Sequence, residues 1–575
     1  MLPALLLMLA ATTPAVTGLR CEYAHDPVGI DVRRPRLSWR LESSRRGERQ
    51  TAWQVLAART PEALAGDRGE LWDSGKVASD QSVNVEYGGP PLASRQRVLW
   101  KVRVWDAFGR ETPWSESASW EMGLLQPSDW QASWIGAKAA ALPAGADAAV
   151  ETTAADFVRY PEPALKSDDP VTRCFRAAID LPAGRRVRSA ALLVAAESAA
   201  RTFVNGRATG EVLPAWDWRR LTRIGVTGAV RPGRNVVALA ATHIYGGRPM
   251  VMAVLQVRFE DGSLQNLATA ASWRASAEET SGWSEAGFDD SRWTAAEVVP
   301  AAEEKIDTAQ LWKVKSWKPT AAAPATYLRR SFAVPGKVSR ARVYATAKGL
   351  YTLLVNGQKA SGDLLRPGWT DYRDRIQYQA YDVTALLHPG QNAVGVVLGD
   401  GWYSGYVAGW GRENWGRAPR ALVQLEVDLD TGETMRVVTD RSWKEASGPI
   451  QAQDLLMGES YDARLEQRGW AEARFDDGGW RPPEVEPAGE VPLVAQVGPA
   501  VRKVVDLRPV AVAERPNGVF VFDLGQNMVG HVRLSVQGRP GTTVRLRHAE
   551  MLKPDGSLYV TNLRAAKATD TYTLK

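Results

Sequence analysis

The sequence predicts an all-β fold of tandem β-sandwiches, and three observations support this prediction. Short runs of Val, Leu, Ala, Tyr and Trp recur between Gly, Pro, Asp and Asn, for example at 97–109, 236–242 and 421–432. Such period-two alternation between turn residues is typical of antiparallel strands. Helical periodicity is almost absent, and residues 61–67 (PEALAGD) are the best candidate for a short helix. At 575 residues the chain exceeds the size of one core. This length predicts about three to five domains.

Charge and composition exclude several classes of protein. The 71 basic and 65 acidic residues give a net charge of +6 and are scattered, so nucleic acid is not an expected partner. No segment after the N-terminus is long and apolar enough to span a bilayer. Two cysteines and five histidines predict neither a disulfide framework nor a zinc site. The unusual number is 23 tryptophans. Tryptophan suits both sandwich cores and sugar-stacking platforms because the indole face is flat and apolar.

The N-terminal stretch predicts export from the cytoplasm. Residues 1–18 (MLPALLLMLAATTPAVTG) form an apolar run followed by small residues, although Lys and Arg are missing before the run. This pattern is typical of a secretory signal peptide. We therefore expect a periplasmic or secreted protein.

Residues 19–126 are predicted to form a fibronectin- or immunoglobulin-like sandwich. A turn at Gly109-Arg110 separates its last two expected strands. Tryptophans recur in the alternating runs, and we interpret them as core and strand-pairing residues. They are Trp39, Trp53, Trp100, Trp105 and Trp120.

The strongest internal signal is a repeat, which predicts two copies of one jelly-roll sandwich at 127–306 and 307–485. The first copy contains FVNG, PGRN, EDG, SW and FDDSRW in order, and the second contains LVNG, PGQN, DTG, SW and FDDGGW. The order and spacing of these punctuating residues are largely shared. The repeat therefore indicates duplicated domains.

Only the second copy is elaborated. Asn235 to Pro249 spans 14 positions whereas Asn392 to Pro419 spans 27, a difference of 13 that falls within LGDGWYSGYVAGWGRENWG at 398–416. Trp273 to Trp283 spans 10 positions whereas Trp443 to Trp470 spans 27, and these 17 extra positions carry GESYDAR at 458–464. The second copy is therefore the one expected to offer an additional surface.

Two motifs common to both copies are interpreted as turns. Asn-Gly in the VNG motif tolerates the left-handed backbone that a tight hairpin requires. The paired aspartates of the FDD motif have the chemistry of cation ligands, but their recurrence at one place in each copy favours a structural turn. These aspartates are Asp289, Asp290, Asp476 and Asp477.

Several blocks of the chain resemble one family of enzymes. LRCEYAHDPVGIDVRRPRLSWRL at 19–41, the stretch 365–405 with GESYDAR, and FDLGQNMVGHVRLSVQGRPGTTVRLRHAEML at 522–552 occur in order. Together they resemble bacterial α-L-rhamnosidases of glycoside hydrolase family seventy-eight. His531 departs from the aromatic residue expected at its position.

The resemblance implies an order of domains and the absence of one of them, the catalytic barrel. It implies that residues 486–575 start a concanavalin-like β-sandwich, which we expect to be incomplete at Lys575. It also implies an (α/α)6 barrel with the catalytic glutamates of inverting hydrolysis, and this barrel is absent from the chain. No residue present is expected to be catalytic. The paired aspartates of the FDD motif are not substitutes, because neighbours on one turn cannot flank a glycosidic bond from opposite faces. We therefore expect the non-catalytic N-terminal portion of an enzyme that removes terminal α-L-rhamnose, inactive alone.

An alternative function is a secreted carbohydrate-binding or adhesion protein of tandem β-sandwiches. Its expected ligands are rhamnose-containing glycans, held by aromatic faces and by polar groups that reach hydroxyls. The candidate residues are Trp369, Asp371, Asp400, Trp402, Tyr403 and Trp410. No metal site or cofactor is predicted apart from calcium, for which Asp371 or Asp400 would be a ligand. A further interpretation is that these aromatic residues pack against the barrel.

Overall fold

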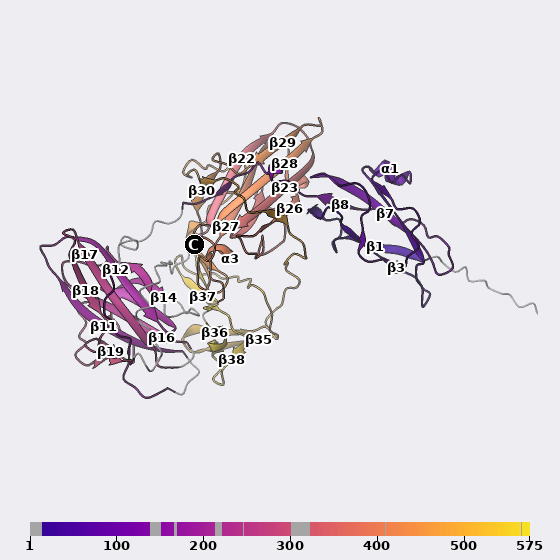
Figure 1. The fold of residues 1–575 in the computed structure, drawn as a ribbon. Helices are drawn as coiled ribbons and strands as arrows, with labels where there is room; N and C mark the ends of the chain where they lie inside the picture. Colours follow the sequence, from indigo (N-terminus) through magenta and orange to yellow (C-terminus); the bar gives the residue numbers. More distant parts are fainter. Residues whose placement is uncertain are drawn as a thin grey trace, which may run out of the picture.

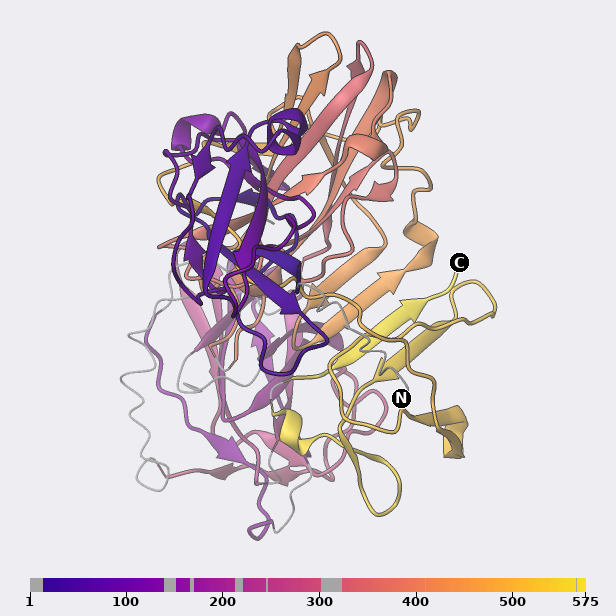
Figure 2. The same ribbon diagram turned by 90° about the vertical axis from the view of Figure 1, so that its right-hand side faces the viewer.

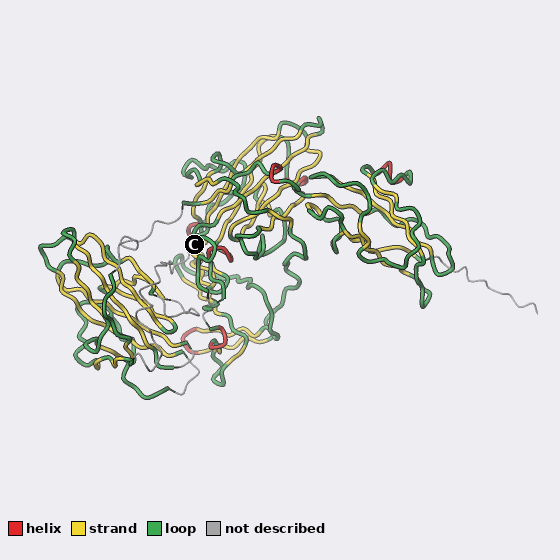
Figure 3. The backbone as a smooth tube through the Cα atoms, in the orientation of Figure 1, coloured by secondary structure: helices red, strands yellow, loops and turns green. Residues whose placement is uncertain are grey.

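In the computed structural model the regular secondary structure is almost entirely β-strand (Figure 1, Figure 3). The structure describes residues 14–138, 151–165, 170–212, 221–244, 247–300, 323–408, 410–564 and 566–575. Within these residues the α-helices are short: α1 (Pro61–Ala65), capped by the Thr60 side chain, and α3 (Gly401–Ser404). Among them no helix is long and apolar enough to cross a membrane. The all-β prediction is confirmed, and the short helix expected at 61–67 forms.

The opening sandwich packs two sheets around buried tryptophans. One sheet has the order β1-β3-β6 and the other β2-β8-β7-β4-β5. Trp39, Trp100 and Trp120 are almost fully buried between them, as predicted. The strands are β1 (Ala15–Cys21), β2 (Val28–Ile30), β3 (Arg36–Glu42), β4 (Ala52–Ala58), β5 (Trp72–Asp73), β6 (Val85–Glu86), β7 (Arg97–Trp105) and β8 (Ala118–Met122).

Strand β1 begins inside the predicted signal peptide. Ala15 pairs with Glu42 and Thr17 with Arg40, so these residues form part of the sandwich. The end predicted at residue 18 therefore cuts a strand. Residues 1–13 lie outside the described residues.

The first jelly roll has sheets of order β15-β12-β17-β10-β21 and β14-β13-β16-β11-β19-β20, with β18 beside β17. Their apolar faces enclose one core of Val, Leu, Phe and Ala side chains with Trp273. The strands are β10 (Val158–Arg159), β11 (Val171–Leu181), β12 (Val187–Ala196), β13 (Ala199–Val204), β14 (Arg207–Val212), β15 (Thr222–Gly225), β16 (Gly233–His243), β17 (Met250–Phe259), β18 (Leu264–Ala268), β19 (Arg274–Ser276), β20 (Thr294–Ala295) and β21 (Glu297–Val298).

The second jelly roll repeats this topology. Its sheets read β26-β23-β28-β9-β33 and β25-β24-β27-β22-β30, with β29 beside β28 and β34 beside β26. The strands are β9 (Trp134–Gly136), β22 (Thr326–Val334), β23 (Val338–Lys348), β24 (Leu350–Val355), β25 (Gln358–Lys359), β26 (Ile376–Asp382), β27 (Gly390–Gly399), β28 (Arg420–Leu429), β29 (Thr434–Val438), β30 (Lys444–Ser447), β33 (Glu484–Glu486) and β34 (Leu493–Ala495). Figure 1 shows it between the opening sandwich and the first jelly roll.

The first jelly roll is inserted into the second. Strand β9 pairs with β28 through Ile135 and with β33, which is the place that β10 takes between β17 and β21 in the first copy. Residues 134–136 therefore belong to the second jelly roll, although the rest of that domain follows 190 positions later, from Thr326. The predicted segment 127–306 thus joins residues of two different modules.

Both repeated motifs form turns. Asn205 and Asn356 have φ of 53° and 49°, as the hairpin interpretation requires. Asp289 and Asp476 accept backbone N–H groups at 3.0 and 2.9 Å, and each following aspartate pairs with a buried arginine. These arginines are Arg176 and Arg329. The aspartates of FDD therefore close a turn in each copy.

The opening sandwich is joined to the second jelly roll by ion pairs and a hydrogen bond. Arg95 donates to Glu426 at 2.6 and 2.8 Å, and Arg342 donates to Glu121 from two nitrogens. The Tyr378 hydroxyl accepts the Leu124 N–H at 3.0 Å. Glu121 and Tyr378 are buried, so this contact excludes water.

The C-terminal module, from Ala511 onward, shares a sheet with the second jelly roll. The 17-residue insertion forms the hairpin β31 (Ile450–Asp454) and β32 (Gly458–Asp462). Strand β32 pairs in parallel with β40 (Thr569–Thr573), which also pairs with β37 (Thr543–Arg547) (Figure 2). Two further hairpins are β35 (Ala511–Arg515) with β36 (Val519–Asp523) and β38 (Met551–Leu552) with β39 (Leu558–Tyr559).

Candidate functional site

The aromatic loop, residues 400–419, connects β27 to β28 in the second jelly roll. It turns sharply at Gly401, which has a φ of 51° and where a Cβ would lie 2.6 Å from the Leu350 Cγ. Only glycine fits this close approach without strain. The turn starts α3, and α3 carries Trp402 and Tyr403.

Three of the predicted tryptophans form one exposed cluster. Trp369 stacks on Trp402 with ring centroids 6.4 Å apart and planes within 5°. Trp410 approaches the edge of Trp369 at 6.4 Å. Trp369 and Trp410 are 48% and 56% exposed, whereas Trp402 is partly buried. Trp369, Trp402 and Trp410 are called the tryptophan surface below.

Asp371 lies beside this surface. Its carboxylate accepts two hydrogen bonds from the Arg373 guanidinium, at 2.9 and 2.7 Å, and the Trp415 indole N–H at 3.0 Å. The hydrogen bonds from Arg373, followed by that from Trp415, hold the pKa of Asp371 well below its usual range. Asp371 is therefore ionised at neutral pH and can accept a hydrogen bond from a hydroxyl group.

Asp400 does not lie on the surface, which corrects the sequence prediction. It is 3% exposed and forms an ion pair with Arg412, which is 4% exposed. Arg412 also donates to Asp454 at 3.3 Å. Burial raises the pKa of Asp400, and the charge of Asp454 raises it further against the opposing effect of Arg412. Asp400 therefore stabilises the aromatic loop through a buried ion pair and does not face a ligand.

Tyr403 has a mainly packing role. Its ring meets Tyr372 edge to face with centroids 5.2 Å apart, and both belong to the cluster under the loop. Burial raises the pKa of Tyr403. Its ring therefore supports the tryptophan surface from below.

Arg412, Trp415 and Arg373 are not among the site residues predicted from the sequence. Trp415 packs against Trp369 at 6.3 Å and donates to Asp371, so it links the two predicted residues. The sequence signal for Arg412 is an arginine among the glycines and aromatic residues of the loop, which also contains Arg417. Its pairing with Asp400 depends on the folded loop.

Both predicted calcium ligands are already engaged by arginine. Arg373 and Trp415 occupy Asp371, and Arg412 occupies Asp400. Within the part of the chain that the structure describes, no group of three or more His, Cys, Asp or Glu has metal-binding geometry. The donor set does not fit calcium, which prefers six to eight oxygen ligands.

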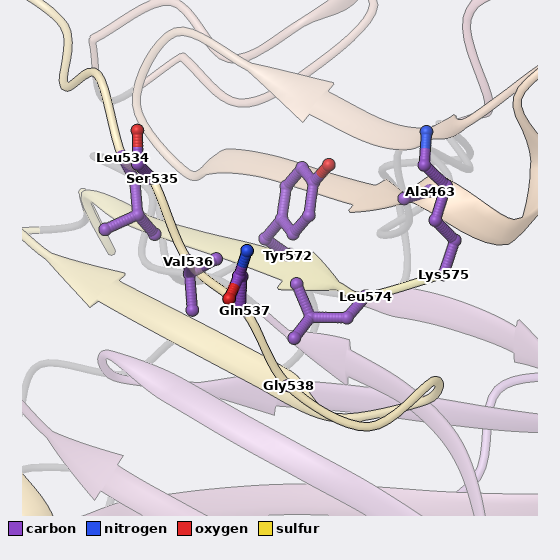
Figure 4. A pocket seen from close by; sticks show the side chains of 9 residues that line it. All are labelled: Ala463, Leu534, Ser535, Val536, Gln537, Gly538, Tyr572, Leu574 and Lys575. Carbon is purple, nitrogen blue, oxygen red and sulfur yellow. The ribbon is translucent and has the colours of Figure 1, made fainter.

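A separate cavity of about 1040 Å³ lies beside β40 in the C-terminal module (Figure 4). Tyr572 and Leu574 face the segment 534–538 across it, with Ala463 and Lys575 at one side. Among the described residues that line this cavity there is no Asp or Glu side chain. A pair of carboxyl groups flanking a glycosidic bond is therefore not available there.

Three family models match consecutive parts of the chain. The immunoglobulin domain found at the N-terminus of Rha78A-like proteins matches residues 16–126. The α-L-rhamnosidase N-terminal domain matches residues 336–505, and the bacterial α-L-rhamnosidase concanavalin-like domain matches residues 513–575.

Whole-chain relatives agree with this order. An α-L-rhamnosidase of Streptomyces avermitilis is 43% identical over 99% of this chain and 54% of its own length. One of Formosa agariphila is 27% identical over 95% of this chain and 41% of its own. The chain thus spans about half the length of the curated relatives it matches.

Solved structures give the same result. The crystal structure of the Streptomyces avermitilis α-L-rhamnosidase complexed with L-rhamnose aligns with a TM-score of 0.69 at 42% identity, covering 98% of this chain and 54% of that one. The α-L-rhamnosidase of Dictyoglumus thermophilum aligns with a TM-score of 0.61 at 25% identity, covering 98% and 44%. The chain belongs to the bacterial α-L-rhamnosidase family and corresponds to the N-terminal portion of its members.

Proposed function

We propose that this chain supplies the accessory domains of an α-L-rhamnosidase, which hydrolyses terminal α-L-rhamnose with inversion, and that these domains alone hydrolyse nothing. The observation that carries the proposal is the 43% identity to an α-L-rhamnosidase over 99% of the chain. The site chemistry supports the second part. Asp371 and Asp400 are both paired with arginine, and neither is free to act as general acid or base.

The test is a hydrolysis assay with two proteins. The chain alone should release no chromophore from an aryl α-L-rhamnoside. A hybrid in which this chain replaces the matched half of the Streptomyces avermitilis enzyme should hydrolyse it. Turnover by the chain alone contradicts the accessory role, and a folded but inactive hybrid contradicts the rhamnosidase assignment.

Within that role, the tryptophan surface is proposed to bind rhamnose-containing glycans. The exposed faces of Trp369 and Trp410 offer apolar area for one side of a pyranose ring. The ionised Asp371 lies beside them to accept a hydroxyl. This combination of an aromatic platform and a fixed acceptor suits a neutral sugar.

Binding is tested by titrating the chain with methyl α-L-rhamnoside and following tryptophan fluorescence and heat. Trp369→Ala and Trp410→Ala should each weaken binding about fivefold or more, because stacking of a ring on an aromatic side chain contributes on the order of 1–3 kcal/mol. Phe108→Ala is the matched control, because Phe108 is similarly exposed but lies in the opening sandwich. Equal affinity in all four proteins removes the proposal.

We also propose that the protein is exported to the periplasm or the medium, because the apolar run at 1–18 is typical of a signal peptide. The test is the N-terminal sequence of the protein recovered from the periplasm or medium of expressing cells. Recovery only in the cytoplasm, with Met1 retained, contradicts export.

A further inference from the structure

Arg412 closes the base of the aromatic loop. Its guanidinium forms a buried ion pair with Asp400, twelve positions earlier, and this pair closes the loop segment between them. Trp402 follows Asp400 by two positions and Trp410 precedes Arg412 by two. Both ends of the tryptophan surface are therefore fixed close to this pair.

Asp454 carries the connection onward to the β31–β32 hairpin. Its Oδ2 accepts from Arg412 at 3.3 Å and from the Tyr406 N–H at 2.8 Å. Its Oδ1 accepts the N–H groups of Leu456 and Met457 at 2.9 and 3.1 Å. One fully buried carboxylate therefore holds the aromatic loop with one oxygen and the hairpin turn with the other.

The hairpin turn in turn holds the start of β40. The carbonyls of Leu456 and Met457 accept the N–H groups of Ala568 and Thr569 at 3.1 and 3.3 Å. Lys567 donates a hydrogen bond to Glu211 of β14 at 2.6 Å, so the first jelly roll also contacts the segment just before β40. Each step in this path is a hydrogen bond or ion pair between neighbouring groups.

We propose that Arg412 is a positioning residue that couples sugar binding at the tryptophan surface to the seating of β40 in the C-terminal module. The proposal rests on the proposed sugar binding. A ligand on Trp369 and Trp410 fixes Trp410 directly and Trp402 through its stacking on Trp369, and this favours the geometry of the Asp400–Arg412–Asp454 triad. By linkage, a seated β40 favours sugar binding by the same factor.

The test measures hydrogen exchange of the chain with and without methyl α-L-rhamnoside. Binding, followed separately by tryptophan fluorescence, should slow exchange of the Leu456, Met457, Ala568 and Thr569 amides by about fivefold or more. Binding without any change at these amides overturns the coupling and leaves the proposed function intact. No fluorescence change at all contradicts sugar binding instead, and the unliganded measurements below then decide the coupling.

Two variants test the path without ligand. Thr571→Pro removes a ladder N–H from the centre of the sheet formed by β32, β40 and β37. It should speed exchange of the distant Tyr406 amide by about fivefold or more, and unchanged exchange there overturns the proposal. Arg412→Lys keeps the positive charge but loses the planar guanidinium that binds Asp400 and Asp454 at the same time. Combined with Thr571→Pro, it should abolish the effect on the Tyr406 amide. Arg176→Lys, which changes a buried arginine of the first jelly roll, should preserve that effect. Transmission that persists in Arg412→Lys also overturns the proposal.

Discussion

Arg342 of the second jelly roll binds the Glu121 carboxylate of the opening sandwich with Nε, at 3.0 and 3.1 Å from the two oxygens, and with Nη2 at 3.0 Å from one of them. Arg340 adds another hydrogen bond to the same carboxylate at 2.6 Å. Two arginines on one strand therefore hold a single buried glutamate across a domain boundary. This contact, together with Arg95 and Glu426, sets the orientation of the first domain.

Replacing Glu121 with Gln is expected to destabilise this interface by about 3 kcal/mol, because the buried Arg342 guanidinium and the partly buried Arg340 guanidinium both lose the charge of a buried partner. Denaturant unfolding should then reveal an earlier transition, and proteolysis should cut near residue 126. Glu116→Gln is the control, because Glu116 is exposed. A single transition identical to that of the parent would show that the pair does not hold the domains together.

The Asp400–Arg412–Asp454 triad holds two carboxylates against one guanidinium. Because the pKa of Asp400 is raised by burial, its contribution to stability is fully present below the pKa of the unfolded chain and is lost as pH rises through the folded value. Asp400→Asn should therefore match the parent in acid and become the more stable protein as pH rises towards neutrality.

Melting temperatures between about pH 4 and pH 8 measure this difference. Asp454→Asn is the matched comparison. Asp454 accepts hydrogen bonds from three backbone N–H groups, so this substitution should lower the stability of the protein at every pH. A loss of stability in Asp400→Asn that grows with pH would contradict the assigned direction.

The two Asn-Gly hairpins predict equal effects in the two jelly rolls. Asn356 donates to Asn392 at 2.7 Å and to the Leu386 carbonyl at 2.9 Å, and its Oδ1 accepts the Ala393 N–H. Asn205 makes the same bond to Asn235 at 2.9 Å. Asn356→Ala should cost about 2–4 kcal/mol of unfolding free energy through lost hydrogen bonds and a strained positive φ.

Asn205→Ala should cost a similar amount in the first jelly roll. Asn356→Gly separates the two causes, because glycine restores the backbone and not the hydrogen bonds. If alanine and glycine were equally harmful, backbone strain would play no part.

The nested first jelly roll should be removable. Replacing residues 139–322 with a Gly–Ser linker of about twelve residues keeps β9 in its sheet, and the rest should fold with a melting temperature close to the parent's. Removing 127–322 also deletes β9, which hydrogen-bonds β28 and β33, and should lower it markedly. Equal behaviour of the two deletions would mean that β9 is dispensable.

The sandwiches were predictable because their strands are half buried and alternate, and because both copies keep the same turn residues. The place of β9 was not, since three residues, Trp134–Gly136, carry too little periodicity to indicate their partner. Asp400 was misread because GDGWY has the composition of an exposed loop. Its burial follows from Arg412, twelve positions later, and a sequence does not show which charges meet in a core.

The tryptophans illustrate the same limit. Trp273 and Trp443 are buried, and Trp369 and Trp410 are exposed, although all four follow turn residues. Which face a loop tryptophan presents is decided by its neighbours in space. The repeat comparison placed Trp410 on the added stretch, but Trp369 lies in a block that both copies share, so this comparison did not identify the exposed pair.

The sheet shared by β31, β32, β40 and β37 has a practical consequence for anyone dividing this protein. A cut near residue 485 looks natural from the sequence, yet it would strip β32 of its neighbour and leave β40 with one edge open. Exposed strand edges recruit strands from other chains. Isolated fragments made this way should self-associate, and fragments that keep the hairpin and β40 together should stay monodisperse.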